Sequence, residues 1–248
     1  MQLQKLYSLT RQAIEQQHMI SAGDRVAVGL SGGKDSIALL YAMSGLSKFY
    51  SKPFELEAIT VDLGFGMDFS TLELICDRLK IRYHVISTDI KEIVFDLRKE
   101  NNPCSLCANL RKGALNAKAV ELGCNKIAYA HHRDDFIQTF FMSMLMEGRL
   151  HTLSPYFQLE KTGLYLMRPL YLVSEGEIKS FIKRQDIEVI RNRCPQDGIS
   201  KRAQMDDLVR KLAKDYPDIR KKVFHALQAA EFDDWKSEMK NRNRMDPY

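Results

Sequence analysis

The residues best suited to chemistry form the string Ser31-Gly32-Gly33-Lys34-Asp35-Ser36, which follows an apolar run and precedes a helical pattern. Two adjacent glycines lack the Cβ atoms that would keep backbone N–H groups from closing around an anion. The first-turn amides of the following helix point to the same place, where the helix dipole also favours negative charge. A phosphate group is therefore the expected ligand. The simpler interpretation is a tight strand-to-helix turn that carries a surface lysine.

Three cysteines form a second group of candidates. Cys104 and Cys107 are separated by two residues at the start of a helical pattern, and Cys194 lies in a comparable loop. The helix dipole stabilises thiolates at a helix start, and a two-residue gap brings both sulfurs onto one metal. The pair alone is compatible with a redox dithiol, half a zinc site or part of an iron–sulfur site. Cys76 and Cys124 fall in or at the end of helical patterns, where buried cysteine is ordinary.

Two carboxylates form the third group, in the stretch Ala130-His131-His132-Arg133-Asp134-Asp135 at the end of a strand pattern. Asp134 and Asp135 could chelate Mg²⁺, which prefers oxygen ligands and retains several waters. Taken alone, the stretch is better explained as an acidic helix N-terminus with exposed histidines. Its occurrence together with the other two groups favours the metal site.

The elements around these groups must bring them together. Short Val- and Ile-rich runs alternate with helical patterns, which argues for a parallel sheet covered by helices on both faces. Ligands of such sheets collect at the carboxyl ends of the strands, so Leu30, Val61 and Ala130 should converge on one crevice. We therefore predict an α/β fold with a parallel five-stranded sheet. The predicted strands are 26–30, 56–61, 82–86, 126–130 and 164–168. The predicted helices are 2–20, 36–49, 69–79, 89–99, 105–122, 133–147, 174–185, 201–214 and 217–238.

Three regions follow from this order: an N-terminal helical extension (1–23), the sheet domain (24–173) and a C-terminal helical region (174–248). Residues 148–163 have little periodicity, and we treat them as a substrate-facing loop. From Lys179 to Lys222 there are thirteen Lys or Arg against seven Asp or Glu, whereas the whole chain has a net charge of only +5. A basic region beside a phosphate site predicts a polyanionic substrate.

Composition narrows the class of protein. With 248 residues and 45% hydrophobic content the chain can bury a full core. No stretch approaches the ~20 apolar residues of a membrane span, and the polar N-terminus lacks a secretory signal, so we expect a cytoplasmic protein that does not enter a membrane. Five cysteines in a chain of this length do not form a small-domain disulfide framework, and we expect core thiols or ligands.

The loop over 31–36 resembles the pyrophosphate loop (PP-loop) of ATP pyrophosphatases, which cleave ATP between the α and β phosphates and leave an adenylated substrate. From about residue 20 to about residue 225 the chain resembles the tRNA 2-thiocytidine synthetase (TtcA) family. The motifs that carry this resemblance, in the family's order, are Ser31–Ser36, Pro103–Cys107 followed by Leu110-Arg111, His131–Asp135 followed by Thr139, and Arg168-Pro169-Leu170. Two features depart from the family: residues 190–193 lack a second cysteine, and the stretch after Gly148 is not proline-rich.

The resemblance implies a Rossmann-like PP-loop fold and a tRNA sulfurtransferase. ATP would adenylate the C2 oxygen of a pyrimidine, in the first instance cytidine in the anticodon loop, with release of pyrophosphate, and sulfur would then replace that oxygen. The implied ATP-binding residues are Leu30, Ser31, Gly32, Gly33, Lys34, Asp35, Ser36, Val61, Asp62 and His131. Mg²⁺ would lie on Asp35, Asp134 and Asp135, and the implied catalytic residues are Lys34, Asp35, Arg111, Asp134 and Asp135.

The same resemblance assigns the cysteines. Cys104, Cys107 and Cys194 would hold a [4Fe–4S] cluster by three thiolates, which leaves one iron free to bind sulfide and present it to C2. The implied partners are tRNA, which we place against Lys201 and Arg202, and a sulfur donor, either a cysteine desulfurase or free sulfide. A homodimer is compatible with this interpretation.

Three alternatives differ in chemistry. An adenylating ligase or amidase of the same fold would use the cysteines only for zinc, and its preparation would be colourless. A thiolase could instead act on a uridine or on a small-molecule acceptor. A nucleotide sensor would bind ATP without turnover, and the Lys34-Asp35 pair and the cysteine triad would then be superfluous.

Overall fold

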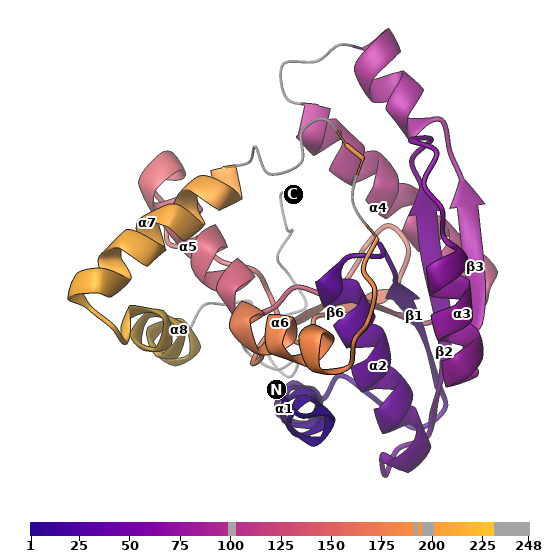
Figure 1. The fold of residues 1–248 in the computed structure, drawn as a ribbon, viewed down its shortest axis with the longest axis horizontal. Coiled ribbons are helices and arrows are strands. Elements are labelled where there is room, and N and C mark those ends of the chain that lie inside the picture. Colours follow the sequence, from indigo (N-terminus) through magenta and orange to yellow (C-terminus); the bar gives the residue numbers. More distant parts are fainter. Residues whose placement is uncertain (99–102, 191–192, 195–200, 231–248) are drawn as a thin grey trace.

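The computed structural model describes residues 1–98, 103–190, 193–194 and 201–230. Its centre is a six-stranded sheet with the order β3-β2-β1-β4-β6-β5, in which every neighbouring pair is parallel except β5 and β6 (Figure 1). The strands are β1 (Asp24–Gly29), β2 (Phe54–Asp62), β3 (Arg82–Ser87), β4 (Lys126–Ala128), β5 (Tyr156–Gln158) and β6 (Tyr165–Met167).

The predicted α/β fold is confirmed, but the prediction of five strands, all parallel, is wrong. The sixth strand, β5, lies inside 148–163, which we treated as a loop. It has three residues, too few to show the alternation by which a strand is recognised in a sequence. It pairs antiparallel to β6 at the edge of the sheet, a common addition to an otherwise parallel sheet.

The helices agree with the predicted ranges to within a few residues in most cases. The first helix ends at Gln16 and not at residue 20, and the segment predicted as a helix over 89–99 contains a π-helix, η1 (Glu92–Leu97). The last described helix ends at Ala229, and the remainder of the predicted 217–238 helix lies beyond the described residues. The α-helices are α1 (Leu3–Gln16), α2 (Lys34–Phe49), α3 (Ser70–Leu79), α4 (Pro103–Glu121), α5 (Arg133–Glu147), α6 (Glu175–Arg184), α7 (Lys201–Asp215) and α8 (Ile219–Ala229).

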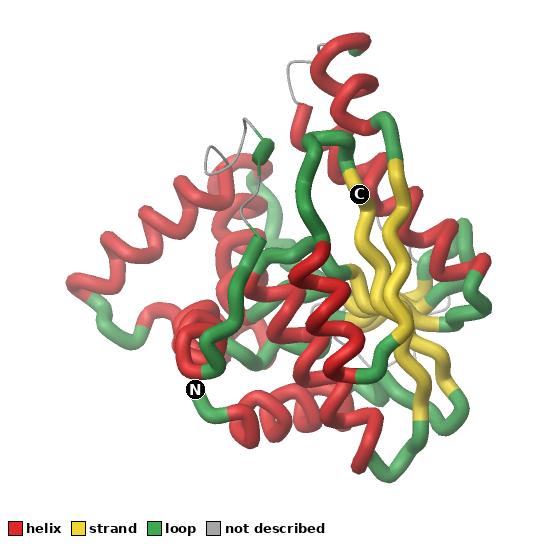
Figure 2. Tube along the Cα trace, turned by 45° about the vertical axis from the view of Figure 1, so that its right-hand side comes forward, coloured by secondary structure: helices red, strands yellow, loops and turns green. Residues whose placement is uncertain are grey.

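The sheet has a hydrophobic cluster on each face. Val26 and Val28 of β1 belong to the larger cluster with α1, α2, α5 and α6, whereas Ala27 between them belongs to a smaller cluster beneath α4. Alternate residues of a strand point to opposite faces, so β1 is buried on both sides, as expected for a central parallel strand. Figure 2 shows the strands lying between these helical layers.

The last two helices pack against α5 and join the larger cluster. Phe224 of α8 is buried, and its ring centroid lies 6.5 Å from that of Phe136 on α5. Met205 and Val209 of α7 are buried in the same cluster. Within the described ranges, no helix combines the length and apolar character needed to cross a membrane.

Candidate active site

The glycine-rich loop joins the carboxyl end of β1 to the start of α2. Gly32 has a φ of +83°, a conformation that side-chain-bearing residues rarely adopt. The hydroxyl of Ser36 donates to the carbonyl of Gly33 (2.9 Å) and accepts from the N–H of Ser31 (3.2 Å), which holds the turn closed. No described side chain caps the N-terminus of α2, so its first amides can receive an anion.

Lys34 at the start of α2 lies between two carboxylates. Its Nζ is 2.8 Å from Asp35 Oδ2 and 3.2 Å from Oε1 of Glu175, the first residue of α6. Burial alone would lower the pKa of Lys34, but the two carboxylates outweigh burial and raise that pKa. Burial would raise the pKa of Glu175, but its pairs with Lys179 and Lys34 lower it. The lysine is therefore charged and is available to a phosphate that displaces Glu175.

Buried His132 lies between the partly exposed carboxylates of Asp35 and Asp135. Its Nε2 atom is 3.6 Å from Asp35 Oδ1, and its Nδ1 atom is 3.4 Å from Asp135 Oδ2. Asp35 Oδ1 is buried and makes no hydrogen bond within the described structure. An orphaned carboxylate oxygen beside a phosphate loop fits Mg²⁺, which takes one or two protein carboxylates together with phosphate oxygens and water.

Asp134, which we predicted as a ligand of Mg²⁺, lies among protein partners. Its Oδ1 atom is 2.7 Å from the guanidinium of Arg220 on α8, and its Oδ2 atom accepts the backbone N–H of Glu175 at 2.8 Å. Both oxygens of this buried carboxylate are therefore engaged, and it links α5 to α6 and α8. Asp135, by contrast, pairs with the guanidinium of Arg202 at 3.2 Å. Arg202 thus faces the site, whereas Lys201 beside it is exposed.

His131 follows β4 and accepts a hydrogen bond at Nδ1 from Nε of Arg168 (3.1 Å). Burial, followed by the positive charges of Arg168, Arg202 and Lys112, holds the pKa of His131 well below its ordinary value. The ring is therefore neutral, and its proton lies on Nε2. Arg168 is itself buried and lies over the ring of Phe157 in β5, 5.4 Å from the centroid. The strand that the sequence did not reveal thus supports a residue of the site.

Two of the three candidate cysteine ligands, Cys104 and Cys194, lie close enough to Cys107 to affect its pKa. Burial raises the pKa of Cys107, the charge of Arg111 lowers it, and the thiols of Cys194 and Cys104 raise it further. The structure therefore brings Cys104, Cys107, Cys194 and Arg111 into electrostatic range. All five cysteines lie within the described residues, and none forms a disulfide.

The other two cysteines differ from these three. Burial raises the pKa of Cys76 to about 12 and that of Cys124 to about 11, so both remain neutral thiols in the core. The donor set that fits a cluster is the triad, because Cys104 is exposed and Cys107 and Cys194 are only half-buried. Within the described residues, no three Cys, His, Asp or Glu side chains converge on a position for a single metal ion.

The remaining predicted ATP-binding residues lie where the strands end. Leu30 is buried and donates its N–H to the carbonyl of Ile59 (2.8 Å). Asp62, next to Val61, accepts the N–H of Gly64 (3.0 Å) on its carboxylate. A cavity of about 350 Å³ begins just beyond this point, at the carboxyl ends of β2 and β3, and is lined by Leu63, Gly64, Thr88, Asp89, Lys91, Glu92 and Asp96.

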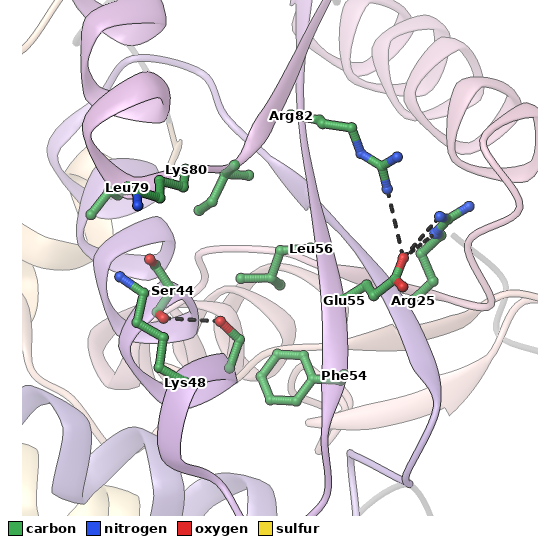
Figure 3. A pocket seen from close by; sticks show the side chains of 11 residues that line it. Arg25, Ser44, Lys48, Phe54, Glu55, Leu56, Leu79, Lys80 and Arg82 are labelled. Atoms are coloured by element: carbon green, nitrogen blue, oxygen red, sulfur yellow. Dashed lines mark hydrogen bonds and ion pairs between the residues drawn. The ribbon is translucent and has the colours of Figure 1, made fainter.

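A larger cavity of about 440 Å³ lies at the opposite edge of the sheet, where β1, β2 and β3 begin (Figure 3). Its charged groups are mostly paired, since Glu55 lies 2.8 Å from Arg25 and 3.6 Å from Arg82. No residue of the glycine-rich loop lines it. We therefore locate the chemistry at the carboxyl edge, where the titratable groups with unpaired atoms gather, and not in the larger hollow.

Comparison with known proteins identifies the family of the chain. A family model described as the PP-loop domain matches residues 4–210. The tRNA-cytidine(32) 2-sulfurtransferase of Syntrophotalea carbinolica is 35% identical, covering 90% of this chain and 88% of that protein. The enzyme of the same name from Pseudomonas putida is 33% identical, and the match covers 90% of this chain and 83% of that enzyme. The chain belongs to the tRNA-cytidine(32) 2-sulfurtransferase (TtcA) family of PP-loop proteins. The resemblance inferred from the motifs is thus confirmed.

A solved structure shares the fold of this TtcA-family chain. The U34-tRNA thiolase NcsA from Methanococcus maripaludis, solved with its [4Fe-4S] cluster, superposes with a TM-score of 0.71 at 22% identity. The match covers 88% of this chain and 76% of NcsA. At this identity the likeness concerns the fold.

Four residues of the TtcA-family site were missed from the sequence alone. Glu175 and Arg220 contact Lys34 and Asp134 from helices far along the chain, and a sequence pattern does not indicate such pairs. His132 and Arg168 belonged to motifs that we quoted, so signals for both existed, although neither was assigned a role.

Proposed function

We propose that this TtcA-family chain is an ATP-dependent tRNA sulfurtransferase. It adenylates the C2 oxygen of a cytidine and releases pyrophosphate; sulfide then adds at C2, and the oxygen leaves with AMP. The position we propose is the one in the names of its relatives, cytidine 32. The observation that carries the proposal is that one edge of the sheet bears both the phosphate loop and the cysteine triad.

The nucleotide half of the reaction rests on α2 and its neighbours. Lys34 exchanges its contact with Glu175 for the β and γ phosphates, and the amides of the loop receive the same oxygens. Oδ1 of Asp35, which has no hydrogen-bond partner in the described structure, would hold Mg²⁺, and this ion when bound would supply positive charge opposite the leaving pyrophosphate. Asp135, held by Arg202, shapes the second side of this site, while Asp134 positions the ends of α5 and α6.

The sulfur half rests on the triad. Cys104, Cys107 and Cys194 would hold a [4Fe–4S] cluster, which when bound supplies an iron position for sulfide. Arg111 lies in electrostatic range of Cys107, where its charge favours the thiolate. Neutral His131, with its proton on Nε2, offers a hydrogen-bond donor at the same edge.

Transfer RNA would lie against the C-terminal region (174–248), the sheet domain (24–173) would bind ATP, and residues 1–23 form a helical extension. Because Arg202 and Arg220 pair with carboxylates of the site, we assign the phosphate contacts to exposed basic side chains that face solvent, namely Lys201, Lys211, Lys214 and Lys222. Free sulfide or a cysteine desulfurase would supply the sulfur. We also propose a homodimer, which sedimentation with and without tRNA would detect.

Anaerobic turnover tests the function. Unmodified tRNA, ATP, Mg²⁺ and sulfide should give one AMP and one pyrophosphate for each thiolated cytidine, measured by nucleoside mass spectrometry. Lys34→Ala should abolish all three products, Cys107→Ser should abolish the thionucleoside, and Cys124→Ser should leave turnover unchanged. Release of ADP and orthophosphate would refute the reading of the loop. A colourless zinc protein that adenylates without thiolating would be a ligase, and 2-thiouridine as the product would correct the base.

A further inference from the structure

The chain leaves α6 along a segment that crosses the glycine-rich loop. We call residues 187–190 and 193–194 the strap. Asp186, with a φ of +49°, turns the chain away from the helix, and Ile187 packs against the larger core cluster. In Figure 1 the orange trace after α6 passes α2, and a separate short orange stretch lies near α4.

The first contact of the strap is with Gly32. The backbone N–H of Ile190 donates to the Gly32 carbonyl at 2.9 Å. The Ile190 side chain lies directly on the same residue, because a Cβ atom added to Gly32 would be 2.9 Å from Ile190 Cβ and 3.0 Å from Cδ1. Because glycine has no Cβ atom, Gly32 can adopt a positive φ and can also be approached closely by the strap.

The second contact is made next to the cysteine. The guanidinium of Arg193 donates to the carbonyl of Gly66, in the loop that follows β2, at 2.7 Å. Half-buried Cys194 is the next residue of the chain. The strap thus links the loops after β1 and β2 to Cys194.

This arrangement fixes an amide of the phosphate site. In a trans peptide the C=O and N–H groups point in opposite directions. Because the Gly32 carbonyl points at Ile190, the N–H of Gly33 points away from the strap. Within the described structure that N–H reaches only Ser31 Oγ, at 3.5 Å, which leaves it available to an anion.

We propose that Ile190 is a positioning residue of the phosphate loop, and that the strap couples ligation of Cys194 to the binding of ATP. The inference rests on the proposed function in one respect, that Cys194 ligates a cluster. Ligation at Cys194 restricts the end of the strap, which stabilises the Ile190–Gly32 contact and orients the Gly33 amide. By thermodynamic linkage, bound ATP must stabilise cluster ligation by the same factor.

Binding measurements on the full chain test the coupling without turnover. The probe is α,β-methylene-ATP with Mg²⁺, titrated by calorimetry into anaerobic protein with its cluster and into apoprotein. We expect the cluster-loaded protein to bind at least about fivefold more tightly, the lower end of typical coupling between sites. The same nucleotide should slow the loss of iron to a chelator.

Variants locate the coupling in the strap. Ile190→Gly should bring the ratio of the two dissociation constants close to one. Val189→Gly is the matched control, because it adds the same backbone freedom one residue earlier at a side chain that is 38% exposed, and it should keep the wild-type ratio. Arg193→Ala removes the hydrogen bond to Gly66 together with a positive charge near Asp68. It should lower the ratio, and it serves as the test should Ile190→Gly fail to fold.

The outcomes separate this proposal from the proposed function. Equal affinities of wild-type apoprotein and cluster-loaded protein would overturn the coupling, and thiolation of tRNA by the same preparation would show that the function stands. A wild-type ratio in both Ile190→Gly and Arg193→Ala would remove the strap from the coupling. Failure of the protein to take up iron would instead refute the proposed function.

Discussion

Replacing Gly32 by alanine should destabilise the apoprotein by about 3 kcal/mol. The left-handed backbone conformation, with a φ of +83°, costs a residue with a Cβ about 1–2 kcal/mol. The new methyl group would lie 2.9 Å from Ile190 Cβ, and relieving such a contact typically costs about 1–3 kcal/mol. The lower entropy of the unfolded alanine chain offsets about 0.4–1 kcal/mol of this cost.

Gly33→Ala is the matched control for the same chemical change. Gly33 has a φ of −77°, which any residue adopts, and a Cβ there would meet only Ser31 Oγ at 3.6 Å. Its stability should lie within about 0.5 kcal/mol of the wild type or rise slightly. Both proteins would be unfolded in urea and followed by far-ultraviolet circular dichroism, with unchanged dependence on denaturant as the sign that the comparison is valid.

A double-mutant cycle separates the two causes. Adding Ile190→Gly to Gly32→Ala removes the steric contact but leaves the backbone strain, so the two changes should be non-additive by about 1 kcal/mol or more. Equal stability of Gly32→Ala and Gly33→Ala would refute the assigned conformation of the loop. Full additivity in the cycle would refute the contact between the strap and Gly32.

Three further predictions concern other parts of the site. Arg220→Ala should lower the free energy of unfolding, measured in urea, by about 3 kcal/mol, because it leaves buried Asp134 without its cation. The control Lys221→Ala, at a side chain that is 78% exposed, should change this free energy by less than about 0.5 kcal/mol. Folding lowers the pKa of His131, so below about pH 6.5 the unfolded chain binds a proton at this residue that the folded chain does not. The free energy of unfolding of the wild-type apoprotein should therefore fall by about 1.4 kcal/mol between pH 7.5 and 5.5 because of His131. His131→Gln should lack this part of the pH dependence. Cys124→Ser should retain the iron content and visible absorption of the wild type, and bleaching would place this thiol among the ligands.

The sequence was sufficient to predict that the glycine-rich loop and the stretch 131–135 meet, as the approach of His132 to Asp35 shows. Ser31 follows β1 and His131 follows β4, and parallel strands place their carboxyl ends at one edge. The cysteine pair instead lies at the start of α4, after η1. Glycine pairs and helix starts are local signals, which a single sequence carries well. The locations of the loop and of the cysteine pair were therefore predictable within a few residues.

Contacts between distant parts of the chain could not be obtained in this way. Glu175 meets Lys34, and Ile190 meets Gly32, only because of the path that α6 takes beside α2. Short β5 carries too little pattern to be recognised, although its Phe157 supports Arg168. In each of these pairs, tertiary packing determines which two residues meet. The type of a residue, such as a charged or a buried side chain, indicates only that it needs a partner.

The basic C-terminal helices illustrate what a charge count omits. Arg202 and Arg220 entered the local excess of positive charge, yet both pair with carboxylates at the start of α5. A guanidinium suits such geometry because it is planar and offers several donors, whereas lysine keeps a hydrated charge on a flexible stem. The surface left for an RNA backbone is therefore mainly one of lysines such as Lys211 and Lys214. Charge on these helices thus falls into two groups: Arg202 and Arg220 pair with carboxylates of the site, whereas exposed lysines such as Lys211 and Lys214 are the side chains that we propose for contacts with tRNA phosphates.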